Sequence, residues 1–291
     1  MEPGSAPSVT RSPAMRARPP RLPGYVLGPR LGGGPTCDVY SAANGDGCFD
    51  WAVKVLRDDA AADPTNVQLL RREARAGMAV RHPHLVRVVR SGADGPAPVH
   101  LVMRRVPGRS VRIALRRKGW LDPALAGSIG RQVAEALAAL HAAGYVHGDV
   151  KPENIHLGPD RTATLLDLGF AHRPGEDESL LDTGFVLGTA NYVAPELCDQ
   201  PETDGPAADV FSLGVTLFEL LTGELPYPAG GIEETMLQHR DSAPESLRAW
   251  RGKWPAGVVS VLDRMLARDP AARPPAAEVG AELMAVFMDA Q

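Results

Sequence analysis

The stretch HGDVKPENIHL, His147 to Leu157, gathers Asp149, Lys151 and Asn154 within six residues. A carboxylate can accept the proton of a hydroxyl group, and an ammonium group can neutralise a phosphoryl group during its transfer. An amide oxygen is one of the hard donors that Mg²⁺ prefers. The three side chains therefore indicate phosphoryl transfer, and the alternative is an ordinary solvated polar turn.

Other charged residues and one glycine-rich stretch are ambiguous when each is taken alone. Asp167 follows an apolar strand in TLLDLGF, where it is placed to bind a metal, although Asp-x-Gly is also a common turn. Lys54 lies in the apolar strand WAVKVL, and Glu73 lies on a helix, and both are typical of solvent-facing charges. The stretch LGGGPTCDVY, Leu31 to Tyr40, is either a tight turn or a loop that approaches a phosphate, because glycine has no Cβ.

Length and composition indicate a folded, water-soluble protein. The 291 residues are 44% hydrophobic and carry a net charge of -4, which excludes the concentrated basic surface of a generic nucleic-acid-binding protein. The three cysteines form no C-x-x-C pair, so we expect no zinc site, no disulfide framework and a cytoplasmic location. The N-terminus has no apolar leader, and the most hydrophobic run, VFSLGVTLFELL from Val210, is too short to span a bilayer. We therefore expect neither export nor a membrane span.

The pattern along the chain predicts a tail followed by two lobes. Residues 1–23 are rich in Pro, Ser and Arg and cannot bury enough apolar surface to offset the entropy of ordering, which predicts a disordered tail. Residues 24–106 alternate short apolar runs with turns and predict an antiparallel sheet with one inserted helix at 66–80, whereas residues 107–291 are mainly helical. The predicted strands are 25–32, 37–44, 49–56, 85–92 and 99–106.

Apolar spacing predicts how three helices pack. Helix 209–223 is apolar nearly all round and should lie at the centre of the larger lobe, where Gly223 ends it. Helix 128–144 ends at Gly144, in a position that favours left-handed backbone. The apolar stripe of helix 66–80 is predicted to be Val67, Leu70, Ala74 and Met78, and that of helix 128–144 to be Ile129, Val133, Leu137 and Leu140.

The order of the motifs decides between the alternatives above. The chain carries, in sequence, a glycine-rich turn, Ala-Val-Lys, a helix Glu, H-x-D-x-K-P-E-N, D-x-G and GTANYVAPE. This series resembles the signature set of the protein kinases, in particular the eukaryotic-like Ser/Thr kinases of bacteria, from about Tyr25 to Phe287. The resemblance implies an α+β, bilobal protein-kinase fold, with a small antiparallel β lobe holding one key helix and a larger, mainly α-helical lobe. It also implies transfer of the ATP γ-phosphoryl group to Ser or Thr hydroxyls of proteins, with Mg²⁺.

The resemblance implies a role for each matching residue. Lys54 would bind the α- and β-phosphates and pair with Glu73. Asp149 would be the catalytic base, and Lys151 would steady the γ-phosphate. The residues implied to bind Mg²⁺ are Asn154 and Asp167. The residues implied to line the nucleotide site are Leu31, Gly32, Gly34, Val39, Ala52, Lys54, Glu73, Met103 as the gatekeeper, and Arg105 and Val106 through their backbones.

Further matches concern the larger lobe. Glu196 and Arg273 match a buried ion pair, and Asp209 matches a residue that braces the catalytic loop. Thr189, in GTANYVAPE, is typical of Ser/Thr-specific kinases. Thr183 lies where bacterial relatives are often autophosphorylated, within the activation loop.

Two departures from the family pattern affect the expected regulation and nucleotide binding. Gly148 stands where many kinases carry an arginine that receives the phosphate of a modified activation loop, so we expect activity to depend weakly on phosphorylation of Thr183. Cys37 stands at the third signature glycine, and Pro35 removes one N–H from the loop tip, so phosphate binding is expected to be looser. Cys37 is either a redox-sensitive thiol or an inert small residue. The basic run 104–119 either recruits acidic substrates or is a solvated helix surface.

Two classes of function remain open at this point. The chain is an active Ser/Thr kinase, or it is a pseudokinase that binds nucleotide as a scaffold and transfers little phosphate. Retention of Lys54, Glu73, Asp149, Asn154 and Asp167 favours the enzyme. We expect no sensor domain in the chain, and the sequence names neither the substrate, the activating signal nor the oligomeric state.

Overall fold

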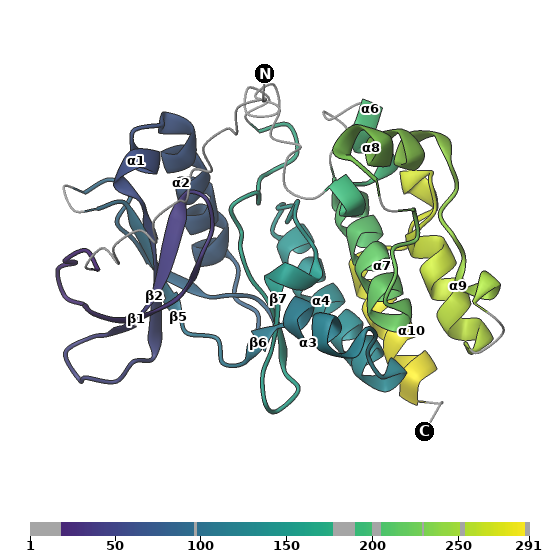
Figure 1. Ribbon diagram of the computed structural model, residues 1–291, viewed down its shortest axis with the longest axis horizontal. Coiled ribbons are helices and arrows are strands. Elements are labelled where there is room, and N and C mark those ends of the chain that lie inside the picture. Colours follow the sequence, from purple (N-terminus) through teal and green to yellow (C-terminus); the bar gives the residue numbers. More distant parts are fainter. Residues whose placement is uncertain are drawn as a thin grey trace, which may run out of the picture.

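The computed structural model describes residues 19–95, 98–176, 190–199, 205–228, 230–250 and 254–288, and these residues form two lobes (Figure 1). The small lobe is built on a sheet, and the larger lobe is mainly helical, which confirms the predicted α+β, bilobal architecture. Thr183 and Thr189 lie outside the described residues.

The small lobe is a five-stranded antiparallel sheet in the order β1-β2-β3-β5-β4. All five predicted strands are present. Leu22, inside the predicted tail, is buried against this sheet, and its carbonyl accepts a hydrogen bond from the N–H of Tyr25, so the packed chain begins before residue 24. The strands are β1 (Val26–Gly33), β2 (Cys37–Ala43), β3 (Trp51–Leu56), β4 (Val88–Ser91) and β5 (His100–Arg104).

Two helices follow β3: α1 (Asp58–Ala61) and α2 (Pro64–Ala79). Helix α2 begins two residues before the predicted range because Asp63 caps it and accepts from the Thr65 N–H at 2.8 Å. The prediction that Met78 belongs to the buried stripe was wrong, since its side chain is 44% exposed. The buried face passes instead through Gly77, where a Cβ would come within 2.4 Å of Val88, so this position needs a residue without a side chain.

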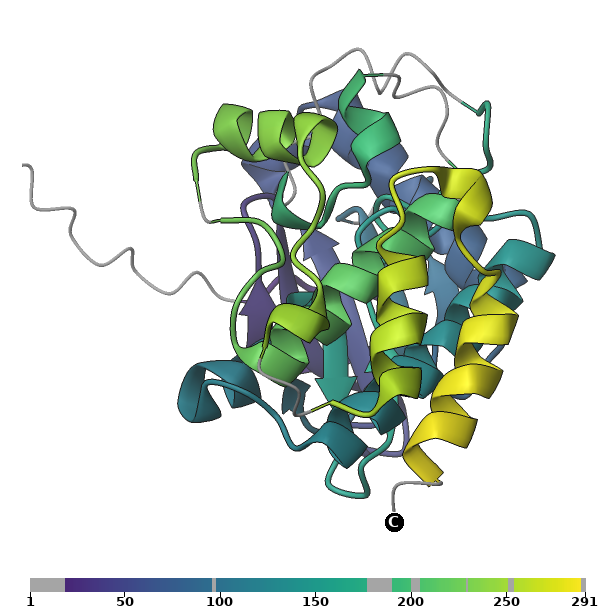
Figure 2. The same cartoon turned by 90° about the vertical axis from the view of Figure 1, so that its right-hand side faces the viewer.

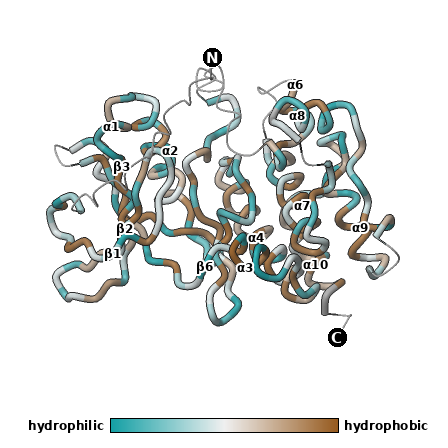
Figure 3. Tube along the Cα trace, in the orientation of Figure 1, coloured by the Kyte–Doolittle hydropathy of each residue, from teal (hydrophilic) through white to brown (hydrophobic). Residues whose placement is uncertain are grey.

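The larger lobe is organised around α4 (Pro123–Ala142) and α7 (Pro206–Thr222), and Figure 3 shows hydrophobic stretches along both. The predicted stripe of α4 is confirmed, because all four of its residues are fully buried. Helix α7 is buried on almost every side, as predicted, and it ends at Gly223 with φ +83°. The close approach of the two helices depends on Gly130, where a Cβ would lie 2.6 Å from Leu217.

The remaining helices cover this pair. Helices α9 and α10 lie side by side on the outside of the larger lobe, facing the viewer in Figure 2. Within the described ranges, no helix combines the length and apolar character needed to cross a membrane. The covering helices are α3 (Val111–Lys118), α6 (Pro195–Asp199), α8 (Ile232–Asp241), α9 (Ala256–Met265) and α10 (Ala276–Met288).

A small three-stranded sheet joins the two lobes and holds the segment quoted first. Its strands, in the order β6-β7-β8, are β6 (Arg109–Ser110), β7 (Ile155–Leu157) and β8 (Ala163–Leu165). The N–H of Val86, just before β4, donates to the Leu165 carbonyl at 2.9 Å, and the N–H of Leu166 donates to the Asn154 carbonyl at 2.7 Å. These bonds fix the loop before β7 and the residues after β8 beneath the large sheet.

Candidate active site

One face of the five-stranded sheet carries most of the residues predicted to bind nucleotide. The register pairs Gly32 with Val39, Val39 with Lys54, and Ala52 with Met103. Residues directly opposite each other on antiparallel strands project to the same face, and residues two apart on one strand share a face. All five positions therefore lie on one side of the sheet.

The glycine-rich turn between β1 and β2 is tightly bonded at its tip. The N–H of Gly34 donates to the Cys37 carbonyl at 2.9 Å, and the Gly34 carbonyl accepts from the guanidinium of Arg57. At Gly32 and Gly34 a Cβ would meet no described atom within 4 Å, so space is open beside the backbone at both positions. Gly33 differs, because a Cβ there would strike the Arg30–Asp38 ion pair that spans the two strands.

The Cys37 side chain is buried under this turn. It packs with Leu56, Leu70 and Ala74, between the sheet and α2. Burial raises the pKa of the Cys37 thiol, and the nearby Lys54 only partly offsets this effect. A buried thiol with a raised pKa holds little thiolate, so the structure favours the inert alternative for Cys37.

Lys54 is the centre of a three-residue ion cluster. Its Nζ lies 2.7 Å from Glu73 Oε2 and 2.8 Å from Asp167 Oδ1. The Lys54 and Glu73 side chains are only 16% and 3% exposed, whereas Asp167 is 42% exposed. Each of the three residues was ambiguous when taken alone. Lys54 on β3 thus contacts both a residue of α2 and a residue of the segment after β8.

Burial and charge act in opposite directions on the pKa values of this cluster. Burial would lower the pKa of Lys54, but Glu73 and Asp167 together raise it, so the ammonium group stays charged. Burial, together with the charge of Asp167, raises the pKa of Glu73 to about 7 despite the opposing effect of Lys54. Burial also acts to raise the pKa of Asp167, but Lys54 outweighs it and lowers that pKa.

The loop before β7 is held from below by Asp209, in the first turn of α7. Asp209 accepts the backbone N–H groups of His147 and Gly148 at 2.8 and 2.9 Å, and its Oδ2 lies 2.8 Å from His141 Nε2. Burial acts to raise the pKa of Asp209, but the hydrogen bond from His141 and the electrostatic effects of His141 and His147 lower it. Gly148 has φ +76°, a backbone conformation that glycine adopts without strain.

The loop before β7 also brings together the side chains of Asp149, Lys151 and Asn154. Lys151 Nζ lies 2.8 Å from Asp149 Oδ1, and Asn154 Nδ2 donates to Asp149 Oδ2 at 2.7 Å and to the Asp149 carbonyl at 2.8 Å. The amide nitrogen of Asn154 is therefore committed to Asp149, which leaves the amide oxygen as the group that can ligate a cation. Asn154 belongs to a turn of 3₁₀ helix, η1 (Pro152–Asn154).

Asp167 adopts an uncommon backbone conformation. Its φ is +59°, in the left-handed region that non-glycine residues rarely occupy, and such outliers are concentrated at functional sites. The next residue, Leu168, is fully buried in the main core, which anchors the segment. The described residues contain no cluster of three or more His, Cys, Asp or Glu side chains able to hold a metal. Mg²⁺ needs only one or two protein ligands when phosphates supply the rest, so Asp167 and Asn154 fit that cation.

The segment after β5 connects the lobes. Met103 is half-buried at the end of β5, opposite Ala52. The N–H of Arg105 donates to the Asp50 carbonyl at 2.9 Å, so this donor is already engaged. Two more residues were assigned to the nucleotide site. Leu31 lies near the end of β1 and is exposed, and Val106 lies in the segment after β5, next to Arg105.

Glu196 and Arg273 form a two-point ion pair in the larger lobe. Both guanidinium Nη atoms lie 2.7 Å from Glu196 oxygens. Arg273 also donates to the carbonyls of Ala207, Ala267 and Arg268, and its guanidinium lies over the ring of a buried phenylalanine. The side chain of Arg273 has no exposed surface, so every donor bond is made inside the protein.

Sequence reasoning missed a second charged cluster next to the loop. Arg112, inside the basic run 104–119, is bonded to Glu153, Tyr192 and Glu219. Arg112 is thus neither a solvated surface residue nor free to recruit an acidic substrate. Glu219 lies 107 positions from Arg112, so no local pattern could have revealed the contact.

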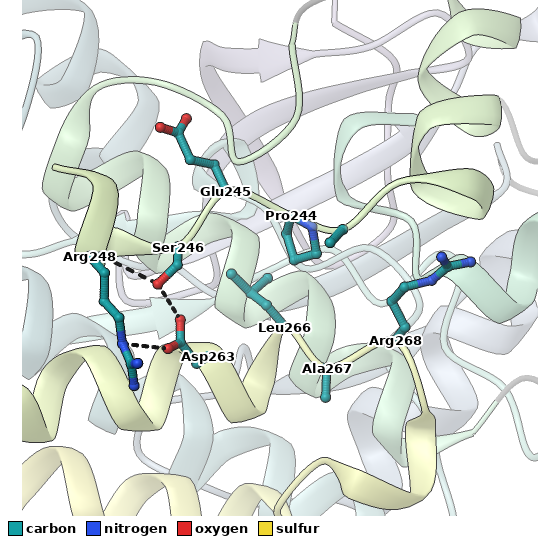
Figure 4. Close-up of a pocket in the computed structure, with 9 residues that line it drawn as sticks. Pro244, Glu245, Ser246, Arg248, Asp263, Leu266, Ala267 and Arg268 are labelled. Carbon is teal, nitrogen blue, oxygen red and sulfur yellow. Dashed lines mark hydrogen bonds and ion pairs between the residues drawn. The ribbon is translucent and has the colours of Figure 1, made fainter.

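A pocket of about 350 Å³ lies elsewhere, in the larger lobe after α8 (Figure 4). Its polar groups bind each other: Ser246 Oγ donates to Asp263 Oδ1 at 2.8 Å, and Arg248 Nε lies 3.5 Å from Asp263 Oδ2. None of the residues predicted to carry chemistry lines this pocket, so we do not assign the active site to it.

A lysine paired to a helix glutamate under a glycine-rich turn, together with a loop that carries Asp, Lys and Asn, is the arrangement typical of two-lobed phosphotransferases of the kinase class. Comparison with known proteins agrees. The protein kinase domain profile matches residues 25–283, and the chain therefore belongs to the protein kinase family, among the eukaryotic-like Ser/Thr kinases of bacteria.

Several bacterial relatives have similar sequences. The serine/threonine-protein kinases PknB of Mycobacterium leprae and of Mycolicibacterium smegmatis are 35% and 36% identical over 92% and 90% of this chain. The serine/threonine-protein kinase PknD of Mycobacterium tuberculosis is 35% identical over 86% of it. The matched parts cover 44%, 43% and 37% of these relatives, so the chain spans less than half of their length.

Proposed function

We propose that this chain is an active Ser/Thr protein kinase, which transfers the γ-phosphoryl group of ATP to Ser or Thr hydroxyls of proteins and uses Mg²⁺. The observation that carries the proposal is the contact of Lys54 with both Glu73 and Asp167. This contact forms only if the sheet, α2 and the segment after β8 meet at one point. We assign residues 24–106, with Leu22 packed against their sheet, to the small lobe, and residues 107–291 to the larger lobe.

The nucleotide would lie under the sheet, between the lobes. The open backbone at Gly32 and Gly34 would admit phosphate oxygens, and Lys54 would neutralise the α- and β-phosphates. Leu31, Val39, Ala52 and Met103 would contact the base. Because the Arg105 N–H is engaged by Asp50, we expect the adenine to bind the Arg105 carbonyl and the Val106 backbone.

The catalytic loop would act on the acceptor hydroxyl. When bound, Mg²⁺ would neutralise phosphate charge, and the Asn154 amide oxygen and the Asp167 carboxylate would hold it. Asp149, fixed by Asn154 and Lys151, would accept the hydroxyl proton. The Lys151 ammonium would exchange its contact with the Asp149 carboxylate for one with the transferring phosphoryl group, because both groups are anions. Positioning and charge neutralisation supply most of the catalysis in this chemistry.

Gly148 is the basis of our proposal on how phosphorylation of the activation loop affects activity. It offers no guanidinium to a phosphate on Thr183, so the activity would depend weakly on phosphorylation of the activation loop. We further propose a soluble signalling domain in the bacterial cytoplasm, acting on protein substrates and not on nucleic acids. The bacterial relatives support the bacterial origin, and the net charge of -4 argues against generic nucleic-acid binding.

Incubation with labelled ATP and Mg²⁺ tests the proposed activity. Label on the wild-type chain or on added protein substrates, and none with Asp149→Asn or Lys54→Met, is the expected result. Exposed Glu224, which makes no side-chain bond within the described residues, provides a matched surface control as Glu224→Gln. Nucleotide binding without any transfer by the wild type would overturn the proposal in favour of a pseudokinase scaffold.

A further inference from the structure

Arg57, the residue that follows β3, is bonded to the tip of the glycine-rich turn. Its guanidinium Nη2 donates to the Gly34 carbonyl, and its backbone N–H donates to the Thr36 carbonyl at 2.9 Å. Because β2 and β3 pair up to Leu56, Arg57 lies beside Thr36, just before β2 begins. One residue outside the turn therefore holds two of its carbonyl groups.

The Gly34 carbonyl belongs to a peptide group that has no donor. The next residue is Pro35, which has no N–H, so the peptide group between the two residues presents only an oxygen. Glycine-rich turns bind phosphates through backbone N–H groups, which carry partial positive charge. An unbound oxygen at the tip of this turn would instead repel a phosphate.

The Arg57 guanidinium places a positive charge at this tip. The side chain is half-buried and forms no ion pair within the residues that the structure describes. Its Nε is buried there without a hydrogen-bond partner, and a buried donor without a partner costs free energy of folding. Stability therefore does not explain why an arginine stands at this position, whereas its bond to Gly34 bears directly on phosphate binding.

The side chains of Lys54 and Arg57 leave the chain on opposite faces of the sheet. The backbone is still extended at Arg57, with φ -69° and ψ 152°, and side chains three positions apart on an extended chain point to opposite sides. Lys54 lies on the face that it shares with Gly32 and Val39, where we propose that the phosphates bind. The bond from Arg57 therefore draws the Gly34 oxygen away from that face.

We propose that Arg57 is a positioning residue for the nucleotide phosphates: it binds the Gly34 carbonyl oxygen, directs it away from the phosphates and offsets its partial negative charge. In this way Arg57 compensates for Pro35, which removes an N–H donor from the tip of the turn. The substitution Pro35→Ala would restore that donor, so the effect of Arg57 should then be smaller. The inference rests on the proposed kinase function and its nucleotide site.

The experiment measures the dissociation constants of ATP, ADP and adenosine on the full chain, by isothermal titration calorimetry with Mg²⁺. The values of kcat and KM for ATP are measured with a Ser peptide. The variants are Arg57→Met, which removes the charge, Arg57→Lys, which keeps it, Pro35→Ala, and Arg57→Met combined with Pro35→Ala. Arg90→Met is the matched control, because Arg90 is exposed on β4 of the same sheet and makes no ion pair in the described part of the chain.

For Arg57→Met, we expect the dissociation constants of ATP and ADP to rise about tenfold, since charge-assisted hydrogen bonds are the strong ones. Adenosine should bind within about twofold of the wild type, because it has no phosphate. KM for ATP should rise about tenfold, while kcat should stay within about threefold. Arg57→Lys should remain within about threefold of the wild type, and Arg90→Met should match it. In the Pro35→Ala background, Arg57→Met should weaken ATP binding only about threefold.

Several results would overturn the inference. Arg57→Met could bind ATP within about twofold of the wild type, or could weaken ATP binding by the same factor with and without Pro35. Equal weakening of adenosine and ATP, or failure of both Arg57→Met and Arg57→Lys to melt cooperatively, would assign Arg57 a purely structural role. A wild-type chain that binds ATP and phosphorylates neither the peptide nor itself would instead overturn the proposed kinase function, and the binding comparison would still test Arg57.

Discussion

Removing the charge of Glu73 gives the sharpest test of the ion cluster at Lys54. Glu73→Gln keeps the size of the side chain and an oxygen that can accept from Lys54, which lies 2.7 Å away. The change replaces an ion pair, whose hydrogen bond is worth about 1.5–3 kcal/mol, with a weaker bond from the Lys54 ammonium to a neutral amide oxygen. A loss of about 1–2 kcal/mol predicts a fall of about 5- to 30-fold in kcat/KM for ATP.

The fall should depend on pH. Burial, with the charge of Asp167, raises the pKa of Glu73 to about 7, so the wild type carries the neutral acid below that pH and the carboxylate above it. The wild-type kcat/KM should therefore rise between pH 6 and pH 8 with one proton released. Gln cannot titrate, so the profile of the variant should be flatter, and the two proteins should converge towards pH 6.

The assay is kcat/KM for ATP with a Ser peptide at several pH values from 6 to 8.5, and Glu224→Gln serves as the control for loss of a surface carboxylate. Thermal melting at each pH checks that the variant is folded. A variant within twofold of the wild type at pH 8, or one whose ratio to the wild type stays constant across the range, would refute the reasoning about Glu73.

Further predictions follow from single positions. Gly148→Ala should lower the free energy of unfolding by about 1–2 kcal/mol in urea titrations, because φ is +76° there, and no loss would contradict the strain. Thr183→Ala should keep more than about a tenth of the wild-type rate in the peptide assay, and a larger loss would refute weak dependence on loop phosphorylation. Arg273→Met should cost about 3–5 kcal/mol in the same titrations because it strands Glu196 and buried carbonyls, and a cost below about 1 kcal/mol would contradict this. Cys37 should resist alkylation by iodoacetamide until the chain is unfolded, and rapid native labelling would refute its burial.

The sequence predicted those parts of the fold and site that rest on local chemistry. Apolar spacing located α4 and α7, because a helix repeats its buried face every three to four residues. Fixed spacing within HGDVKPEN brought Asp149, Lys151 and Asn154 together, since one turn of 3₁₀ helix leaves them little freedom. Lys54 and Asp167 are 113 positions apart, so only the order of motifs assigned them to one site, and their direct contact was not predicted.

The sequence missed contacts that depend on how elements pack. Met78 has helical spacing from Ala74, but the inward face of α2 is set by the approach of Val88 to Gly77, which turns Met78 outward. Arg57 bonds the glycine-rich turn only because β2 and β3 fold back on each other. Such contacts arise from tertiary geometry and leave no periodic signal in the chain.

The contacts of Lys54 also bear on how the cleft would accept a nucleotide. Lys54 and Glu73 belong to the small lobe and Asp167 to the larger one, so the Lys54–Asp167 pair joins the lobes across the cleft. Asp167 is the exposed member, and its left-handed φ stores about 1–2 kcal/mol of strain. An anion that reaches Lys54 would release the Asp167 oxygen for a cation without leaving Lys54 unpaired. Because Glu73 keeps its buried bond to Lys54, the exchange would be confined to the exposed side of the cluster and would leave α2 in place.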